Sequence, residues 1–345
     1  MNNKGFTLIE FLVAMTVMLG LLTMASVSFQ VLTSDVKVST SANQTELDLI
    51  NSRELLRLDI EHLGMGIANF IGSTSTDNNC PLVDWNISNS TLTIYSTLSN
   101  SVSSTIGWAV GACNASGQFD YSNAVYSADS RYTPSPTPPP SILLTPEYVF
   151  DDAVTTTSCP DNGQVFIAFP WDNSPGSNGC SGFLGSQQQC SATAYTVSVS
   201  QPTNVCDQQT RNLLRNSAPV FNCVADYQVL FDWDLDGNGT LASSEKNISR
   251  AAIVSGDSNG AFSTTANVRQ RLKSVRVYIL QQQGKRDENY TSTRFLQSNG
   301  NIVFTVDGVS ITFKTQFATV AERQRFRHYR WKVITVTGSP RELLL

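Results

Sequence analysis

One acidic side chain near the start of a long apolar run constrains this chain more than any other feature. Residues 6–32 are mostly apolar, and Glu10 lies close to the beginning of the run. A helix of about 20 apolar residues spans the hydrocarbon core of a bilayer, whereas a carboxylate inside that core costs roughly 2.5–3.5 kcal/mol. An ordinary membrane anchor therefore explains the length of the run and leaves Glu10 unexplained.

The flanks of the run indicate an anchor that is retained. A secretory signal peptide has a shorter apolar region that ends at a cleavage site of small residues, and no A-x-A site closes this run. Lys4 precedes the run, which favours a cytoplasmic N-terminus. The sequence predicts a single-pass membrane helix, with the rest of the chain on the side of the membrane away from the cytoplasm.

The residues around Glu10 resemble a known signal. "KGFTLIE", residues 4–10, is similar to the class III signal of type IV pilins and pseudopilins. The resemblance implies that a prepilin peptidase cuts after Gly5, removes residues 1–5 and N-methylates Phe6. It also implies that Glu10 acts in assembly by pairing with the N-terminal amine of a neighbouring subunit. Breaking a buried pair typically costs about 3–5 kcal/mol. The alternative is a glutamate at the membrane edge that reaches the headgroups.

The helix is expected to continue beyond the membrane. No Pro or Gly occurs in residues 41–62, and Gly64 and Gly66 then end the pattern. Apolar residues recur there at helical spacing, on one stripe made of Leu49, Leu56, Ile60, Leu63 and Ile67. The sequence thus predicts a helix from Phe6 to about His62 whose second half needs a sheet to cover its stripe.

Beyond residue 70, apolar residues tend to recur at every second position, which is typical of strands. The turn at Asp307-Gly308 is the strongest hairpin signal, because Asp-Gly supplies the positive φ angles of a tight turn. "TPSPTPPPS", residues 133–141, predicts an exposed polyproline loop, with a linker between two β domains as the alternative. The predicted strands are 91–96, 164–169, 195–199, 226–231, 274–280, 302–306, 310–315 and 331–337.

These patterns predict an α+β chain in which a long N-terminal helix packs on an antiparallel β-sheet of a globular head with disulfides, and the resemblance implies that this is the type IV pilin-like fold. The expected segments are a leader at 1–5, the half of the helix in the membrane or filament core at 6–33, its amphipathic half at 34–69, and a β-rich head at 70–345.

The seven cysteines lie outside the apolar run, and no two of them form a CxxC pair. Zinc sites usually combine such short spacings with histidine, and the two histidines, His62 and His328, lie apart from the cysteines. Disulfides in an oxidising compartment are the favoured interpretation, with scattered structural thiols as the alternative. The pairing stays open. Nearest-neighbour bridges would join Cys180 to Cys190 and Cys206 to Cys223, and the odd count leaves one cysteine over.

A second motif, "DWDLDGNGTLASSE" at residues 232–245, resembles an EF-hand calcium loop that follows a strand. A loop that starts at Asp232 leaves Ser243 at the twelfth position, where a bidentate acid is needed. A loop that starts at Asp234 places Glu245 there. The predicted Ca²⁺ ligands are therefore Asp234, Asp236, Asn238, the carbonyl of Thr240, and Glu245. The alternative is a β-turn rich in Asp, Asn and Gly that binds no metal.

Two further stretches narrow the resemblance. "RLDIEHLGMGIANF" and "DYQVLFDWDLDGNG" are similar to the end of the long helix and the C-terminal half of PilW-type minor pilins. This implies a low-abundance pilin that primes pilus assembly or caps the tip, with other minor pilins, the major pilin and the inner-membrane assembly platform as partners, and that moves from the membrane to the extracellular pilus. The alternative is a large type II secretion pseudopilin of the tip complex. Whether the filament serves motility, adhesion, DNA uptake or secretion stays open.

Other classes have less support. A surface enzyme is not expected, because no GxSxG, HExxH or nucleotide-binding loop occurs and the two histidines form no evident dyad. A net charge of −5 gives no overall basic character, so no nucleic-acid partner is predicted directly. A single-pass adhesin that never polymerises would keep residues 1–5, so leader cleavage distinguishes it from a pilin.

Overall fold

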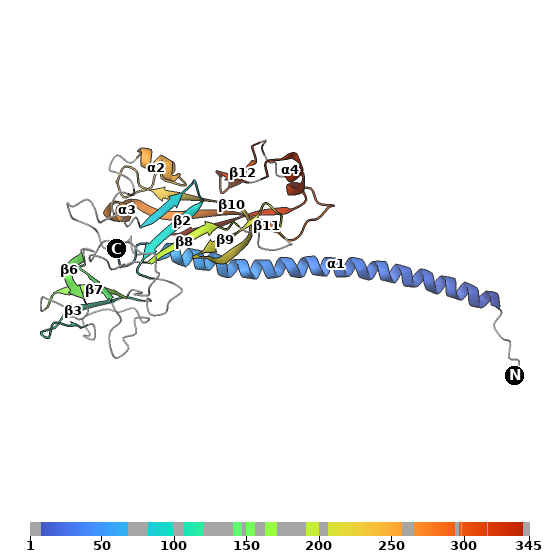
Figure 1. Ribbon diagram of the computed structural model, residues 1–345, viewed down its shortest axis with the longest axis horizontal. Helices are drawn as coiled ribbons and strands as arrows, with labels where there is room; N and C mark the ends of the chain where they lie inside the picture. Colours follow the sequence, from blue (N-terminus) through green and yellow to red (C-terminus); the bar gives the residue numbers. More distant parts are fainter. Residues whose placement is uncertain are drawn as a thin grey trace.

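A computed structural model shows a long helix that extends from a β-rich head (Figure 1). The structure describes residues 8–67, 82–98, 107–120, 141–146, 150–155, 163–170, 191–199, 206–256, 262, 265–293, 297, 299–315 and 317–340, with the backbone alone at 31–48, 142, 150–155 and 191. The long helix and the β-rich head together give the α+β class expected from the sequence.

Helix α1 (Leu8–Glu61) contains 54 residues, which corresponds to a length of about 80 Å. Its first part, Leu8–Gln30, is long and apolar enough to cross a membrane, and no other helix in the described residues is. Apolar side chains are exposed on all sides of this part, which extends away from the head (Figure 1). The predicted start at Phe6 lies outside the described residues.

The helix ends at a turn built on two glycines, close to the predicted end at His62. Gly64 and Gly66 both have positive φ, and the Gly64 N–H donates to the carbonyl of Tyr95 at 2.8 Å. A side chain on Gly66 would clash with Thr97 and Phe169, so this position also needs glycine for close approach. The sequence predicts the amphipathic half of the helix at 34–69, but the structure has a turn at 62–66.

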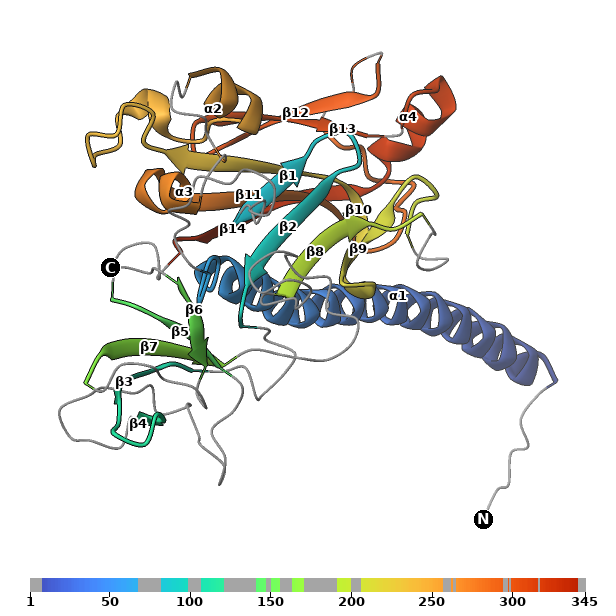
Figure 2. The same ribbon diagram turned by 60° about the vertical axis from the view of Figure 1, so that its left-hand side comes forward.

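A seven-stranded antiparallel sheet forms the larger part of the head (Figure 2). Along the sheet the order is β1 (Val83–Asn86), β2 (Thr91–Ser96), β8 (Ser191–Val197), β9 (Arg211–Arg215), β10 (Ala218–Trp233), β11 (Leu272–Gln283) and β14 (Arg330–Gly338). The strands predicted from the sequence overlap observed ones. The largest difference is in β10, which extends to 16 residues; β8 begins four residues before its predicted start at 195, and β11 extends to 12 residues.

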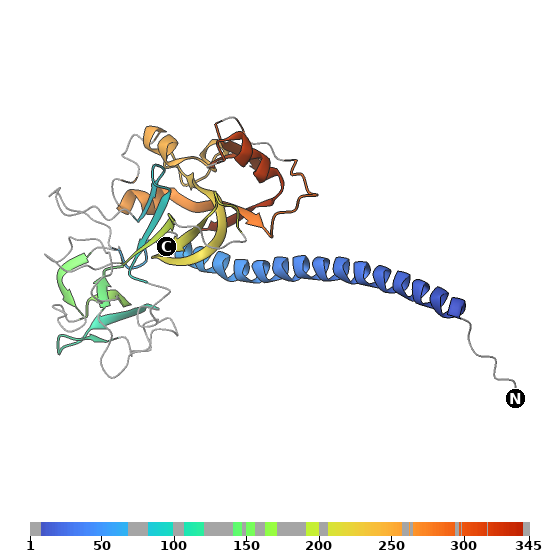
Figure 3. The same cartoon turned by 45° about the vertical axis from the view of Figure 1, so that its right-hand side comes forward.

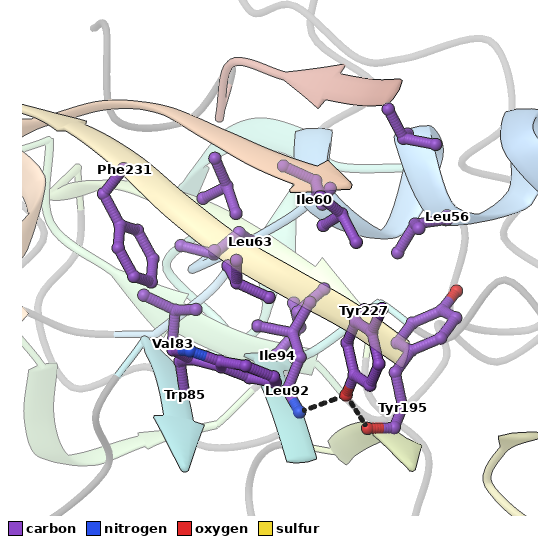
Figure 4. Packing of buried hydrophobic residues seen from close by; sticks show 14 of the residues in the cluster. Leu56, Ile60, Leu63, Val83, Trp85, Leu92, Ile94, Tyr195, Tyr227 and Phe231 are labelled. Carbon is purple, nitrogen blue, oxygen red and sulfur yellow. Dashed lines mark hydrogen bonds between the residues drawn. The ribbon is translucent and has the colours of Figure 1, made fainter. Parts of the chain in front are cut away.

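The amphipathic end of α1 packs against β10, β11 and β14. Leu56, Ile60 and Leu63 of the predicted stripe are fully buried in the main core (Figure 4). Each such side chain contributes roughly 1.5–3 kcal/mol when buried. The Tyr227 hydroxyl, also in this core, donates to the carbonyl of Tyr195 at 2.6 Å and so links β10 to β8. The sheet that the sequence required to cover the stripe is thus present.

A second sheet corrects the expectation of a single one. Strands β2 and β8 pair directly, and the chain between them forms its own five-stranded sheet beside the head end of α1 (Figures 1 and 3). Its order is β4 (Phe119–Asp120), β3 (Ala109–Cys113), β7 (Val165–Pro170), β5 (Ser141–Leu144) and β6 (Phe150–Thr155). Most of these strands are too short or too polar to show a clear period of two. Because β4 and β5 belong to one sheet, the polyproline segment between them does not link two β domains.

The C-terminal part adds a hairpin, β12 (Asn301–Val306) and β13 (Val309–Lys314), and three short helices. Asp307 and Gly308 have φ values of 50° and 79°, as the predicted tight turn requires. The helices α2 (Arg250–Gly256), α3 (Thr265–Arg271) and α4 (Val320–Arg327) were not predicted. α4 begins at a capping box in which the Thr319 hydroxyl accepts from the Glu322 N–H.

The structure joins Cys206 to Cys223, one of the two predicted nearest-neighbour disulfides. Cys113, at the end of β3, is also disulfide-bonded. Cys180 and Cys190 lie outside the described residues. The bridge at Cys206 ties the loop before β9 to the middle of β10.

Candidate functional site

Two regions carry the candidate functional residues, and the first is the start of α1. Glu10 lies in the first described turn of the helix, between Ile9 and Phe11, which are 71% and 63% exposed. The carboxylate thus belongs to a surface that is otherwise apolar. Gly5 and Phe6 lie outside the described residues.

The second region is the loop that follows β10. Trp233 ends the strand and is completely buried, and the pairing with β11 shifts register between Asp232 and Trp233. The chain then turns sharply at Gly237 and Gly239, whose φ values are 73° and 83°. Only glycine adopts such angles without strain, so the sequence fixes the shape of this loop.

Within this loop three carboxylates converge. Single oxygens of Asp234, Asp236 and Glu245 lie within 4.8 Å of one another. Asp234 and Glu245 are only 1% and 4% exposed, whereas Asp236 is exposed. Carboxylates are hard oxygen ligands of the kind that Ca²⁺ and Mg²⁺ prefer. These three residues could therefore hold a divalent cation.

Backbone N–H groups hold the Asp234 carboxylate in place. Its Oδ1 accepts from Gly237 at 2.7 Å and from Asn238 at 3.2 Å, and its Oδ2 accepts from Gly239 at 2.8 Å. Burial raises the pKa of Asp234, but the hydrogen bonds with Gly239, Gly237 and Asp236 and the positive charge of Lys273 together outweigh it, so the pKa lies below its ordinary value. An ionised carboxylate of this kind keeps lone pairs available for a cation.

Asn238 and Thr240 lie in the same turn as the acids. The Asn238 side-chain amide donates to Asp236 Oδ2 at 2.7 Å, and its oxygen accepts from the Thr240 N–H at 2.7 Å and from the Thr240 hydroxyl at 2.6 Å. Asn238 is therefore close to the acidic group, although its oxygen is bonded to Thr240. The predicted ligands thus occupy one compact loop.

Glu245 reaches back across the loop from a single turn of 3-10 helix, Ser243–Glu245. Its Oε1 accepts from the Leu235 N–H at 2.7 Å, and its Oε2 accepts from the Ala242 N–H at 2.8 Å. The carboxylate at the twelfth position is therefore directed toward the first residues of the loop, which is the placement that the motif requires.

The other possible register of the loop would begin at Asp232. Asp232 does not belong to the acidic group, because its carboxylate is bound elsewhere. The Ser274 hydroxyl donates to Asp232 Oδ2 at 2.6 Å, Arg276 donates to the same oxygen at 2.8 Å, and the Asn247 N–H donates to Oδ1 at 2.9 Å. The carboxylates of Asp234, Asp236 and Glu245 therefore converge, and that of Asp232 does not join them.

Sequence reasoning missed one residue that shapes this loop. Arg271, at the end of α3, donates to the carbonyls of Asp234 at 3.0 Å and Leu235 at 2.6 Å. It therefore holds the backbone at the start of the loop. The pattern around Arg271 offered no signal for this role, since the contact depends on how β11 pairs with β10.

Comparisons with known proteins bear on the first region. The family model of the prokaryotic N-terminal methylation motif matches residues 1–26. The search of curated proteins and the search of solved structures found no match. The match indicates a class III signal of the type IV pilin kind, which is found in prepilin-type proteins, both pilin-like proteins and pseudopilins. The motif implies processing by prepilin peptidase and assembly with other pilins at the membrane.

Proposed function

We propose that this protein is a minor pilin of a type IV pilus, of the PilW type, that primes assembly or caps the tip. The observation that carries the proposal is the bulk of the head beside an exposed apolar helix. The five-stranded sheet inserted between β2 and β8 widens the head. A subunit repeated at every step of a thin filament has to leave room for its neighbours, and a wide head fits a rare position or the tip better.

The proposal includes a route from membrane to filament. Leu8–Gln30 anchors the subunit in the inner membrane with its head in the periplasm, and the same surface later packs in the filament core. There Glu10 pairs with the amine of a neighbouring subunit, either another minor pilin or the major pilin. Subunits out of register leave the charge unpaired, which disfavours them.

A large type II secretion pseudopilin of the tip complex is the second candidate, because it shares the signal and the long helix. Immunoblots of sheared surface pili separate the two. A minor pilin appears in these fibres in small amounts relative to the major pilin. A pseudopilin remains with the cells, and loss of the gene then blocks protein secretion rather than piliation.

Mass spectrometry of the membrane fraction tests the processing step. The mature chain should lack residues 1–5 and carry one added methyl group on Phe6. Gly5→Ala should be processed poorly, because the peptidase site of this family accepts little bulk there. Retention of Met1 in the membrane-embedded protein would refute the pilin assignment and favour the single-pass adhesin.

We also propose that the loop after β10 binds Ca²⁺ through Asp234, Asp236, Asn238, the Thr240 carbonyl and Glu245. The support is the convergence of three carboxylates, two of which are buried and accept hydrogen bonds from backbone N–H groups. Lys273 places some positive charge near Asp234, but burying several negative charges close together is costly. A bound cation would neutralise the group and fasten the loop to the end of β10. The alternative remains a β-turn without metal.

A further inference from the structure

A basic surface forms where two distant segments meet at one corner of the head. Residues 284–293 follow β11, and residues 320–332 comprise α4 and the start of β14. Together they carry seven Lys and Arg against three Asp and Glu, in a chain whose net charge is −5. We call this surface the basic face; its cations are Lys285, Arg286, Arg323, Arg325, Arg327, Arg330 and Lys332.

Direct contacts hold the two segments together. The Asp287 N–H donates to the carbonyl of His328 at 2.9 Å, and the Ser292 N–H donates to the carbonyl of Arg327 at 2.7 Å. The Arg330 guanidinium lies 4.8 Å from the centre of the Tyr290 ring. The cations of both segments therefore form one surface.

An aromatic stack makes the corner rigid. The rings of Phe326 and Trp331 stack with centroids 4.7 Å apart, and the Trp331 indole N–H donates to the carbonyl of Phe326 at 2.9 Å. Phe326 is completely buried. The basic side chains around it are thus displayed on a fixed support.

Acidic neighbours neutralise only part of the positive charge. Arg325 pairs with the buried Asp207 at 3.2 Å, Arg330 pairs with Asp287 at 3.1 Å, and Arg286 pairs with Glu288 at 3.1 Å. In the described part of the chain, no acidic side chain pairs with the exposed Lys285 and Arg327. The basic face keeps a positive excess that is available to an anionic partner.

The position of the basic face indicates which partner. β14 runs beside α1, because Arg53 donates to the carbonyl of Thr335 and a side chain on Gly338 would meet Ile60. Its first residue, Arg330, lies about 26 Å nearer the N-terminal end of α1 than Gly338 does, at about 3.3 Å per strand residue. In both views α4 lies on the side of the head toward the N-terminal part of α1 (Figures 1 and 2). The basic face therefore points toward the membrane if Leu8–Gln30 spans it.

We infer that the basic face binds anionic phospholipid headgroups while the subunit is anchored in the membrane; this inference rests on the anchoring proposed above. Membrane-spanning helices tilt by about 20° on average, and the head lies to one side of α1, so a tilt toward that side brings this corner closer to the headgroups. Clustered Lys and Arg beside a spanning helix are attracted to anionic lipid over a distance of about one Debye length. The contact holds the head at the membrane until filament entry separates them.

Hydrogen exchange on the full chain in lipid nanodiscs tests this inference. Discs of phosphatidylglycerol and discs of phosphatidylcholine are compared in the presence of chelator, so that calcium does not bridge protein and lipid. Amides of residues 284–293 and 320–332 should exchange at least about fivefold more slowly in the anionic discs, since each surface cation strengthens such binding by roughly that factor. The difference should shrink in high salt.

A charge reversal with a matched control sharpens the test. Lys285→Glu combined with Arg327→Glu should abolish the lipid-dependent difference. Lys246→Glu, an exposed lysine next to the acidic loop, should leave it unchanged. Unaltered exchange of β10 and β11 in each variant shows that the head is folded.

The possible outcomes separate this inference from the proposed anchoring. If the protein elutes with the discs but exchanges equally in both lipids, the lipid contact is refuted and the anchoring stands. If it does not elute with the discs, both are refuted. Slower exchange in both lipids that grows with the number of copies per disc would assign the basic face to a second protein molecule and overturn the lipid contact.

Discussion

The Nε atom of Arg215 on β9 lies 2.6 Å from Oδ2 of Asp59 on α1, and both side chains are buried. The hydroxyl of Tyr195 on β8 donates to the same carboxylate oxygen at 2.6 Å. These three residues tie the helix to two strands that are adjacent in the sheet. A buried ion pair fixes geometry more than it adds stability, because desolvation offsets much of the attraction.

Removing one partner of this pair should be strongly destabilising. Asp59→Ala leaves the Arg215 guanidinium buried without its counter-charge, which typically costs about 3–5 kcal/mol. Thermal unfolding of the purified protein in detergent, followed by circular dichroism, measures the loss. Tyr195→Phe is the matched control and should cost about 1 kcal/mol, the contribution of one hydrogen bond. Equal melting temperatures for Asp59→Ala and Tyr195→Phe would show that the ion pair has no special role.

Glu10→Val should separate membrane insertion from assembly. The variant should insert at least as well as the wild type, because a charge is removed from the membrane segment. It should fail to enter or prime filaments, because the partner of the neighbouring amine is missing. Fractionation measures the first property and electron microscopy of surface pili measures the second. Normal piliation in a strain that carries only Glu10→Val would reject the pairing role, and Thr16→Val, also exposed on the helix, controls for general effects of substitution there.

Local sequence patterns predicted those parts of the structure that are determined by residues close together in the sequence. The apolar stripe that contains Leu56 and Ile60 predicts the helix end and the sheet that covers it, and Asp307-Gly308 predicts its hairpin. The spacing of Asp234 and Glu245 predicts the acidic loop. Of the five-stranded sheet the patterns predicted only β7, as 164–169, because β4 has two residues and β6 carries two adjacent acidic residues, so neither shows an apolar period.

Contacts that depend on long-range pairing also escaped prediction. Arg271 binds the carbonyl of Asp234 only because α3 leads into β11, which pairs with β10. Asp59 and Arg215 are 156 positions apart, and nothing near either residue indicates the other. The basic face likewise forms only where residues 284–293 and 320–332 meet. The net charge of the whole chain is negative, so it gives no indication of this local positive surface.

Asp226 should make the stability of the head depend on pH. Burial raises the pKa of Asp226 to about 6, although Gln228 and the Lys314 N–H donate to its carboxylate. The folded state therefore holds this proton more tightly than the unfolded state does. The free energy of unfolding should fall as the pH rises from about 4 to about 6 and then level off.

Asp226→Asn should remove this dependence. The variant should be more stable than the wild type at pH 7.5, by at most about 3 kcal/mol, and the two should converge near pH 4, where the wild-type side chain is neutral in the folded state. Denaturant titrations at a series of pH values measure the difference. Asp307→Asn, in the exposed turn of the β12–β13 hairpin, is the control and should follow the wild-type profile. A constant difference between Asp226→Asn and wild type at every pH would contradict the prediction.

Loss of the Cys206–Cys223 bridge should destabilise the head. The bridge spans 17 positions of sequence, and closing a loop of this size contributes about 3 kcal/mol in the chain-entropy model. Cys206→Ser with Cys223→Ser should therefore lower the melting temperature under oxidising conditions, and added reductant should narrow the gap to the wild type. Alkylation of the native protein without reductant should modify no more than one thiol. Four or more modified thiols would contradict the disulfide assignment.

Calcium should raise the melting temperature of the wild-type protein. Binding to the folded state alone stabilises it by about 2.7 kcal/mol at a hundredfold excess over Kd, and extracellular calcium modules often have Kd values of about 10⁻⁴ to 10⁻³ M. The protein should therefore melt several degrees higher in millimolar calcium than in chelator. Mg²⁺ should compete weakly, because it demands octahedral geometry and dehydrates reluctantly. Equal melting temperatures in chelator and in calcium up to about 10 mM would contradict calcium binding and support the alternative, a β-turn that binds no metal.

Three substitutions decide which residues bind the ion. Asp234→Asn and Glu245→Gln should abolish the calcium-dependent shift, because each removes a charge from the convergent group. Asp232→Asn should lower the melting temperature in chelator, since Arg276 then loses its buried partner, but it should preserve the shift on adding calcium. Loss of the shift in Asp232→Asn with its retention in Glu245→Gln would assign the loop to the other register, because only a loop that starts at Asp232 uses that carboxylate and dispenses with Glu245.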